Sequence, residues 1–587
     1  MASKHFSNDP AALVGACLRS LALINPSVTV DEAHKTVSLR GAETTNNVVV
    51  ISGGGSGHEP SFAGFVGEGM LSAAVAGSIF ASPSADQVFR CLLRLGSQRR
   101  DAGILIVIMN YTGDNLHFGL AIEKARAAGS SCKLLVVGDD AGIGRAQSGR
   151  IGRRGLAGTV LIQKIAGAMA HKGYGLEAVY NAALQVSENI ATIGASLAHV
   201  HVPGRAVSDH PLASTDEIEI GMGIHNEEGF GRTKSDLPGL IKTLLEQLLS
   251  QSDKDRAFIN IHPGEDAVLL VNNLGGLSQL ELGAITSEVC VQLEQSYGIR
   301  PRRIMAGTYM SSLNGPGFSI TLLKLVNQGW LQLIDAPTQA SGWLPAINTI
   351  DAQRPQDEIK SPVEDAVTMD SPQPSKLRIN PQVAHNALVN GLNSVIAAEP
   401  DVTKYDTLVG DGDCGLCLKN SAEAVLLFLS QQSPPEEDAV SLVQGITIVV
   451  ERCMDGTSGA LYAIFLNALT HALRQQSDKL DEACQINVAM WASALSSALS
   501  ALSRYTPAQP GDRTVIDALA PFVAAISETR DISLAVEAAR RGCEATKGMK
   551  ASLGRSVYVG GEEWQRCPDP GAFGLLKLLE GLTRVQS

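Results

Sequence analysis

The sequence lacks the features that would direct it to nucleic acid or into a membrane. It has no basic run, and 60 acidic against 47 basic residues leave a net charge of −13. Such a surface repels nucleic acid and anionic lipid, and a phosphate substrate would have to arrive as a metal complex. The longest apolar run, Gly103–Met109, is far shorter than the roughly 20 residues of a membrane-spanning helix. The N-terminus lacks the basic-then-apolar layout of a signal peptide, so we expect a cytoplasmic protein without nucleic-acid or membrane partners.

The ten cysteines show neither the spacing of a disulfide framework nor that of a closed zinc site. Cys414 and Cys417 form the one close pair, whereas a closed zinc site normally takes four ligands. We therefore expect reduced thiols in a reducing compartment. At 587 residues and a mean hydropathy of +0.08, the chain is long enough for two to four domains with sizeable cores.

The first part of the chain alternates short β-branched runs with helical stretches, which is typical of α/β layering with strands buried on both faces. The candidate strands cover 47–52, 103–109, 132–138, 267–272, 318–323 and 331–335. The candidate helices include 84–95, 118–128, 158–170 and 175–196. The pattern predicts an α/β domain over residues 1–350, made of two subdomains over about 1–200 and 201–350.

Residues 351–376 are rich in Pro, Asp, Gln and Ser and lack periodicity, which predicts an exposed linker. Beyond it no strand is indicated, and apolar residues recur at helical spacing. The predicted helices cover about 382–398, 416–430, 440–453, 459–474, 483–504, 514–527, 532–546 and 571–583. Residues 377–587 are therefore predicted to form an all-α domain.

Two motifs follow apolar strands of the first domain. Ser52–Pro60 (SGGGSGHEP) has four glycines in six positions, which lets the backbone approach a ligand and hold a phosphate or substrate oxygen. Asn110–Asp114 (NYTGD) follows another strand, and ligands of open α/β sheets collect beyond such strand ends. Asp114 could accept a proton from a hydroxyl there. Taken singly, the first motif is explained equally well as a tight turn, and a lone Asp114 is more often a turn former or helix cap.

A third motif, Gly221–Glu227 (GMGIHNE), places His225 among glycines. Neutral imidazole is a competent nucleophile toward a carbonyl, although a lone histidine is more often structural. A fourth motif brings Asp406, Asp411 and Asp413 close together in the second domain. Carboxylates this close repel one another unless a cation binds, and oxygen ligands suit Mg²⁺ or Ca²⁺. A solvated acidic turn is the alternative.

Three further loops of the second domain combine small, hydroxylated and arginine residues at predicted helix ends. They are Asp455–Ala460, Pro510–Thr514 and the stretch from Gly554 to Gly571. Phosphate groups are bound by such residues and by helix N-termini. Together with the acidic loop, they indicate a metal–nucleotide site.

These residues together resemble the single-chain, ATP-dependent dihydroxyacetone kinases, a family that includes the triokinase/FMN cyclases. The shared motifs occur in the family's order over essentially the whole chain: SGGGSGHEP, NYTGD, GDDAGIG, GRRGLAGT, GMGIHNE, VNNLGGLSQLELG, GDGDCG, TSGALY, PGDRT and DPGA. The resemblance implies an α/β substrate-binding domain followed by an eight-helix barrel that binds ATP and two Mg²⁺ ions. It further implies phosphorylation of dihydroxyacetone and glyceraldehyde by a homodimer.

The resemblance also implies roles for individual residues. His225 would hold the substrate carbonyl as a hemiaminal, and His58 and Asp114 would complete the catalytic set, with Asp114 as the base. The substrate-binding residues would be Gly55, Ser56, Gly57, His58 and Asp114. The metal ligands would be Asp406, Asp411 and Asp413. The residues around the nucleotide would be Asp413, Cys414, Gly415, Leu416, Thr457, Ser458, Arg513, Thr514, Arg555, Asp569, Pro570 and Gly571.

Four positions depart from the family pattern. Met109 replaces a common lysine, Phe62 a second histidine, Asp455 a glycine and Leu416 a threonine. Loss of the lysine removes a charged hydrogen-bond donor, which would weaken substrate orientation by about 1.5–3 kcal/mol. Two alternatives stay open, a cyclizing FAD–AMP lyase activity of the helical domain and a carbonyl-binding regulatory protein. The sequence leaves open which triose is preferred, and whether glycerol use or detoxification is the role.

Overall fold

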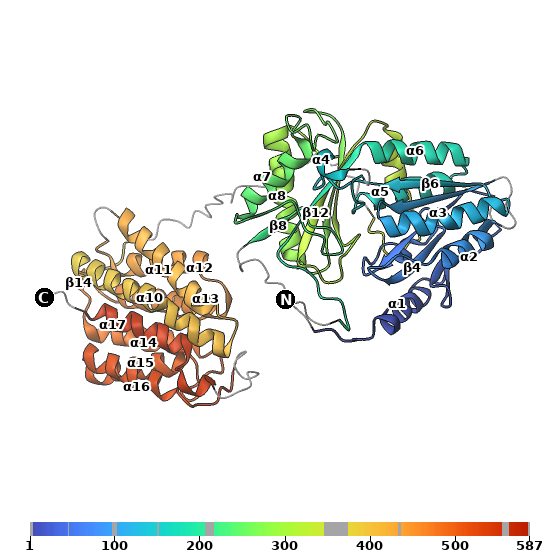
Figure 1. The fold of residues 1–587 in the computed structure, drawn as a ribbon. Coiled ribbons are helices and arrows are strands. Elements are labelled where there is room, and N and C mark those ends of the chain that lie inside the picture. The colour runs from blue at the N-terminus through green and yellow to red at the C-terminus, as the bar shows by residue number, and fades with distance from the viewer. Residues whose placement is uncertain are drawn as a thin grey trace. The chain divides into compact units, whose positions relative to one another are not determined.

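A computed structural model describes residues 4–44, 46–96, 102–149, 152–205, 217–345, 374–432, 436–553 and 563–584. The chain divides into two compact units, Met1–Ser361 and Pro362–Ser587 (Figure 1). The first is built from sheets and helices and the second from helices. The predicted order of fold classes is therefore confirmed. Most of the predicted linker falls outside the described residues.

The first sheet has the strand order β1-β2-β4-β3-β5-β6, and β4, β3, β5 and β6 run parallel. Its strands are β1 (Val28–Asp31), β2 (Thr36–Leu39), β3 (Val49–Ser56), β4 (Ala73–Ile79), β5 (Ile104–Met109) and β6 (Cys132–Val137). The helices of this part of the chain are α1 (Pro10–Ile24), α2 (Ala85–Gly96), α3 (Thr112–Ala127), α4 (Arg145–Ser148), α5 (Thr159–His171) and α6 (Leu176–Glu188).

Strand β5 shows why the parallel strands are apolar throughout. Ile104, Ile106 and Ile108 pack into a core with α2 and α3. The alternate residues of the strand, Leu105 and Val107, pack into a second core with α1, α5 and α6. Because successive side chains point to opposite faces, a strand covered on both sides needs apolar residues at every position.

The second sheet has the order β11-β10-β12-β7-β8-β9 and is antiparallel except for the β10–β11 pair. Its strands are β7 (Ile190–Ser196), β8 (Ile218–Ile220), β9 (Gly231–Thr233), β10 (Ala267–Asn273), β11 (Arg303–Gly307) and β12 (Gly317–Lys324). Helices α7 (Leu237–Leu249) and α8 (Gln279–Tyr297) cover one face. The other face, through Val268 and Leu270, joins the core of α1, α5 and α6, so the two sheets share a core.

Two of the predicted elements are wrong. Residues 331–335, predicted as a strand, lie largely within helix α9 (Gly329–Ile334), and the predicted helix 175–196 contains both α6 and the buried strand β7. Short apolar runs are compatible with a buried helix or a buried strand, and only tertiary packing decides between them. Lys164 fixes the end of α9, because its ammonium group donates to the carbonyls of Leu333 and Ala336.

The helical unit contains eight α-helices in the described residues, as predicted: α10 (Pro381–Val409), α11 (Cys414–Gln431), α12 (Ala439–Cys453), α13 (Gly456–Asp478), α14 (Val488–Leu502), α15 (Ile516–Thr529), α16 (Ile532–Ala545) and α17 (Pro570–Leu582). Consecutive helices pack side by side and α17 packs against α10, which closes a barrel. The barrel encloses an apolar cavity of about 570 Å³. A short parallel pair, β13 (Leu377–Arg378) with β14 (Cys484–Gln485), was not predicted.

None of the helices in the described ranges combines the length and the apolar character that crossing a lipid bilayer requires.

Candidate active site

The glycine-rich motif forms the end of β3 and the turn that follows it. A Cβ atom on Gly55 would lie 2.8 Å from the backbone nitrogen of Ala81, and Gly57 has a φ of +101°. Both positions therefore require glycine. The hydroxyl of Ser56 donates to the carbonyl of Gly77 and is buried, so this side chain ties the turn to β4. Among the side chains of this motif, the imidazole of His58 is the group that is positioned to take part in a reaction.

His58 and His225 meet although they lie 167 residues apart in the sequence. Their Nε2 atoms are 3.0 Å apart, and the Nδ1 of His58 lies 2.9 Å from the carbonyl oxygen of Ser311. The Nδ1 of His225 lies 2.9 Å from one carboxylate oxygen of Glu227, whose other oxygen accepts the backbone N–H of His225 at 2.8 Å. His225 follows β8 in a turn where Asn226 adopts a φ of +65° and bonds Val200 through its side chain.

These partners fix the protons of the two imidazoles. A carbonyl and a carboxylate accept only, so both Nδ1 atoms carry hydrogen and both Nε2 atoms are left with lone pairs. Two lone pairs 3.0 Å apart repel, and the contact therefore requires one shared proton. Burial and then the charge of His225 lower the pKa of His58 to about 3. Burial would raise the pKa of Glu227, but the hydrogen bonds and charge of His225 outweigh it and lower this pKa to about 2.

Aromatic rings border the histidine pair while leaving it open to solvent. Tyr111 and Phe80 contact the ring of His225 edge-on, at centroid distances of 4.7 and 5.2 Å. Phe80 also stacks on His58 at 5.2 Å. The His225 side chain nevertheless keeps 21% of its exposure, whereas His58 is fully buried. A small carbonyl compound can therefore reach His225 from solvent.

Asp114 lies in the first turn of α3 and is buried. Its Oδ1 has no hydrogen-bond partner among the described residues. Its Oδ2 lies 3.6 Å from the point where a Cβ on Gly54 would be, so the carboxyl group faces the glycine-rich strand end. Burial raises the pKa of Asp114 to about 6, although a hydrogen bond with Ser82 and the charge of His225 oppose the shift. A buried carboxyl group with a free oxygen and this pKa is suited to proton transfer.

A buried ion pair supports the turn that carries His225. Arg154 donates through Nε to Asp140 at 2.7 Å and through Nη2 to the carbonyl of Gly221 at 2.7 Å. The positioning residues Glu227, Ser311 and Arg154 were not predicted as functional. Glu227 and Arg154 stand in motifs that the sequence displays, GMGIHNE and GRRGLAGT, whereas the contact of Ser311 arises from a backbone carbonyl that leaves no trace in the sequence.

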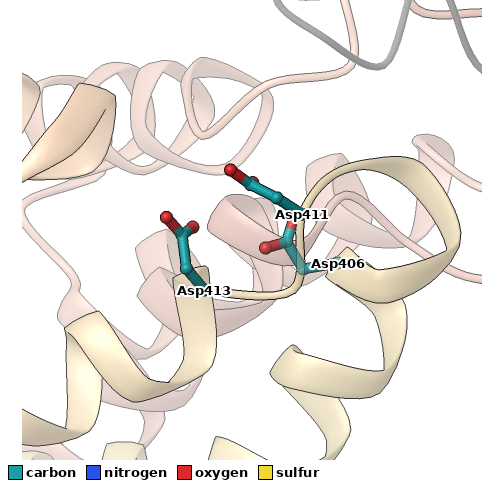
Figure 2. A group of neighbouring side chains, drawn as sticks. All are labelled: Asp406, Asp411 and Asp413. Atoms are coloured by element: carbon teal, nitrogen blue, oxygen red, sulfur yellow. The ribbon is translucent and has the colours of Figure 1, made fainter. Parts of the chain in front are cut away.

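The acidic cluster lies in the helical unit, where α10 ends and α11 begins (Figure 2). One carboxylate oxygen from each of Asp406, Asp411 and Asp413 lies within 4.8 Å of the others. Asp406 also accepts the backbone N–H of Cys414 at 3.0 Å, which ties it to the start of α11. Gly412 turns the loop with a φ of +79°. An all-oxygen cluster open to solvent fits a hard divalent cation such as Mg²⁺.

Other predicted nucleotide residues gather at the same barrel end. The Sγ of Cys414 lies 4.0 Å from the hydroxyl of Ser458, so the N-termini of α11 and α13 are neighbours there. Thr457 lies in the same turn as Ser458, and Leu416, which is half exposed, follows the buried Gly415.

The loop before α17 carries a buried carboxyl group. Asp569 caps this helix ahead of Pro570 and Gly571. Burial raises the pKa of Asp569 to about 7, and the charges of Asp517 and then Asp406 contribute to the shift.

Two of the residues that were predicted to bind the nucleotide make hydrogen bonds within the helical unit. Arg513 is buried and donates to the carbonyl of Cys567 at 3.1 Å. The backbone N–H of Thr514 donates to Asp517 at 2.7 Å, which fixes the start of α15. Arg555 lies outside the described residues.

Comparison with known proteins places this arrangement in a family. A Dak1 domain matches residues 19–342 and a DAK2 domain matches residues 408–584. The dihydroxyacetone kinase of Pichia angusta is 42% identical over 100% of this chain and 99% of its own length. The chain belongs to the dihydroxyacetone kinase family.

Family members with different names share this full-length match. The triokinase/FMN cyclase of Bos taurus is 36% identical, covering 100% of this chain and 99% of its own. The crystal structure of the dihydroxyacetone kinase from C. freundii in complex with AMP-PNP and Mg²⁺ is 29% identical, with a TM-score of 0.61 over 99% of both chains. The family assignment therefore covers both units.

At two of the positions that depart from the family pattern, the side chain is buried in the core of the α/β unit. Met109 is 1% exposed, and a Cβ on Gly155 would lie 2.6 Å from the Cβ of Met109. Phe62 is 4% exposed and its ring packs beside Gly54. Because both side chains are buried and apolar, neither supplies a hydrogen-bonding group at its position.

Proposed function

We propose that this chain is an ATP-dependent kinase that phosphorylates dihydroxyacetone, and glyceraldehyde as a second substrate. The observation that carries the proposal is the solvent-accessible imidazole of His225, held between the Glu227 carboxylate and His58. Family membership supports the same activity, because curated relatives that match the full chain are named dihydroxyacetone kinases.

The histidine pair supplies both the nucleophile and the acid for carbonyl capture. With the shared proton on the Nε2 of His58, the lone pair on the Nε2 of His225 is free. This lone pair forms a C–N bond to the substrate carbonyl carbon while the carbonyl π bond breaks, and the proton on His58 passes to the oxygen. The product is a hemiaminal whose imidazolium charge is balanced by Glu227. A His58 pKa lowered to about 3 favours this donation.

Asp114 accepts the proton of the substrate hydroxyl that attacks phosphorus. In the helical unit, Asp406, Asp411 and Asp413 would hold two Mg²⁺ ions, which when bound neutralise charge on the phosphate oxygens. The N-termini of α11, α13 and α17, with the hydroxyls of Thr457 and Ser458, would bind the phosphates. We also propose that the other residues assigned to the nucleotide in the sequence analysis contribute to this binding. The proposed substrate site and the proposed nucleotide site lie on different units, and we therefore propose that the protein acts as a homodimer. We also propose that it is cytoplasmic.

A coupled assay of ATP consumption tests this function directly. We expect turnover with dihydroxyacetone and glyceraldehyde and none with glycerol, because glycerol has no carbonyl group for His225 to capture. Equal turnover with glycerol would contradict the covalent mechanism, and no turnover with any of the three would contradict the kinase.

The pH dependence of turnover tests Asp114. Since burial raises the pKa of this carboxyl group to about 6, the rate should rise as the pH passes about 6 and then level off. Asp114→Asn should remove this limb and lower the rate by about 10²- to 10⁴-fold.

Protein stability gives a second readout for Asp114. A raised folded-state pKa means that the fold favours the protonated form, so the stabilising contribution is full below the unfolded pKa and is lost as the pH rises through about 6. The neutral variant Asp114→Asn should therefore melt at a higher temperature than the parent at pH 8. An unchanged pH–rate profile in the variant would show that another group is the base.

A cyclizing FAD–AMP lyase activity is the second candidate. It is favoured by the full-length match to the triokinase/FMN cyclase of Bos taurus, and it would use the same acidic cluster. Incubation with FAD and Mn²⁺, followed by chromatography for cyclic FMN, tests it.

A further inference from the structure

Phe80, which directly follows β4, contacts both histidines of the candidate active site. Its ring stacks on His58 with the ring centroids 5.2 Å apart, and it meets the ring of His225 edge-on, also at 5.2 Å. The centroids of the two imidazoles are themselves 4.8 Å apart. The three rings therefore form a nearly equilateral triangle. This arrangement places the phenyl ring beside the point where the two Nε2 atoms meet.

The backbone of Phe80 is held in a conformation that bulky residues avoid. Its φ is +56°, and positive φ is uncommon for any residue other than glycine, above all for one with a large side chain. The N–H of Phe80 donates to the carbonyl of Ser56 at 2.9 Å, which ties it to the glycine-rich motif. Strained backbone persists where the surrounding structure enforces it, and it clusters at active sites and ligand sites. The conformation therefore indicates that the position of this ring serves the site.

The glycine-rich motif provides the space for this ring. A Cβ atom on Gly57 would lie 2.8 Å from a ring carbon of Phe80, and a Cβ atom on Gly55 would lie 3.1 Å from the Cα of Phe80. A side chain at either position would force Phe80 or its neighbours to move. The two glycines therefore seat the phenyl ring against the histidines as well as shaping the turn. Phe80 stands in none of the motifs identified from the sequence, because its contacts arise from packing.

This position of the ring restricts the space around a captured carbonyl. In the proposed hemiaminal, the former carbonyl carbon is bonded to the Nε2 of His225, and its oxygen has taken a proton from the Nε2 of His58. The substituents of that carbon therefore lie next to Phe80, whose ring borders both imidazoles. Phe80 is partly exposed, so it forms part of the wall that a ligand meets. A packed aromatic wall does not accommodate added carbon atoms freely, because overpacking forces side chains out of their preferred rotamers.

We propose that Phe80 is a specificity-determining residue that limits the carbonyl site to three-carbon compounds. In dihydroxyacetone the captured carbon carries two one-carbon arms. In glyceraldehyde a hydrogen atom takes the place of one arm, so both compounds fit beside the ring. A compound with a further carbon atom on each arm does not fit. The inference rests on the proposed capture of the carbonyl by His225 and adds a limit of size to it.

The test is titration calorimetry of the full chain without nucleotide, comparing dihydroxyacetone with 2,4-dihydroxypentan-3-one. The second compound has a methyl group on each carbon beside the carbonyl, so it cannot turn its bulk away from Phe80 by binding the other way round. It should bind the parent about tenfold more weakly than dihydroxyacetone or worse, since a pocket discriminates against one extra carbon by about this factor. In Phe80→Ala the ratio of the two affinities should fall by about fivefold or more.

A matched control separates the wall of the site from general loosening of the fold. Phe89→Ala removes a half-buried phenylalanine of α2 that packs with Lys124, and it should keep the ratio of the parent. If Phe80→Ala fails to fold, Phe80→Gly removes the same ring and adopts positive φ freely, so the same fall is expected there. Equal affinities in the parent, a smaller fall in the Phe80 variant, or an equal fall in Phe89→Ala would overturn the proposal.

The absence of nucleotide keeps this test apart from the test of the kinase. A parent protein that binds dihydroxyacetone with the expected size limit but consumes no ATP would contradict the kinase and support the role of Phe80. A parent protein that binds neither ketone would overturn the carbonyl site and the role of Phe80 together.

Discussion

Replacing His225 with alanine is expected to lower dihydroxyacetone-dependent ATP consumption by about 10³-fold or more, because the variant has no nucleophile to hold the substrate. The loss should persist at saturating dihydroxyacetone, since a substrate that binds without the covalent bond is not fixed for transfer. Initial rates over a range of dihydroxyacetone concentrations measure this. Turnover equal to that of the parent would remove the covalent mechanism.

The controls for this variant separate loss of chemistry from loss of fold. His171→Ala removes an exposed histidine at the end of α5 and should leave the rate unchanged. Binding of ATP with Mg²⁺ should be unchanged in His225→Ala, because the acidic cluster lies in the other unit. Glu227→Gln keeps a hydrogen-bond acceptor for His225 but removes the balancing charge, so its rate should lie between those of the parent and His225→Ala.

Replacing Asp413 with asparagine is expected to abolish ATP-dependent turnover, because the acidic cluster loses one of the three carboxylates that we propose hold the cation. The parent should melt at a higher temperature when MgCl₂ is added, since a ligand that binds only the folded state stabilises it. This shift should be lost in the variant. Differential scanning calorimetry with and without MgCl₂ measures both effects.

The melting temperature of the metal-free protein gives a second, independent test of the acidic cluster. Three carboxylates within 4.8 Å repel one another, so Asp413→Asn should melt no lower than the parent when chelator is present. Asp401→Asn, an exposed carboxylate on α10 outside the cluster, is the matched control and should keep both turnover and the Mg²⁺ shift. A Mg²⁺ shift that survives in Asp413→Asn would place the cation elsewhere.

Elements with strong local signals were predicted correctly from the sequence. The helices of the second unit carry an apolar stripe that repeats at helical spacing, as in Ala422, Val425 and Leu429, and these residues are buried in the barrel. Strand β5 was predicted because parallel strands covered on both faces are apolar throughout. The misassigned segment 331–335 had no such signal, since a short apolar run fits a helix as well as a strand.

The residues of the candidate sites divide in the same way, into those with a strong local signal in the sequence and those without one. The acidic cluster was predictable because its three aspartates are neighbours along the chain, and the structure places their oxygens together. Ser56 and Arg513 were assigned to ligands by their motifs, but the structure shows their side chains bonded to backbone carbonyls. A motif identifies which residues lie near a site, whereas the direction of each side chain depends on the partners that folding supplies.

The sequence by itself determined the order of the two units and the family, and it predicted which residues carry chemistry, because these depend on local periodicity and on motifs of a few residues. Only the tertiary structure decided that the Nε2 atoms of His58 and His225 meet and that burial raises the pKa of Asp114. Proton positions and pKa values depend on burial and on atoms within a few ångströms. Those neighbours come from segments far apart in the chain, such as Ser311 beside His58.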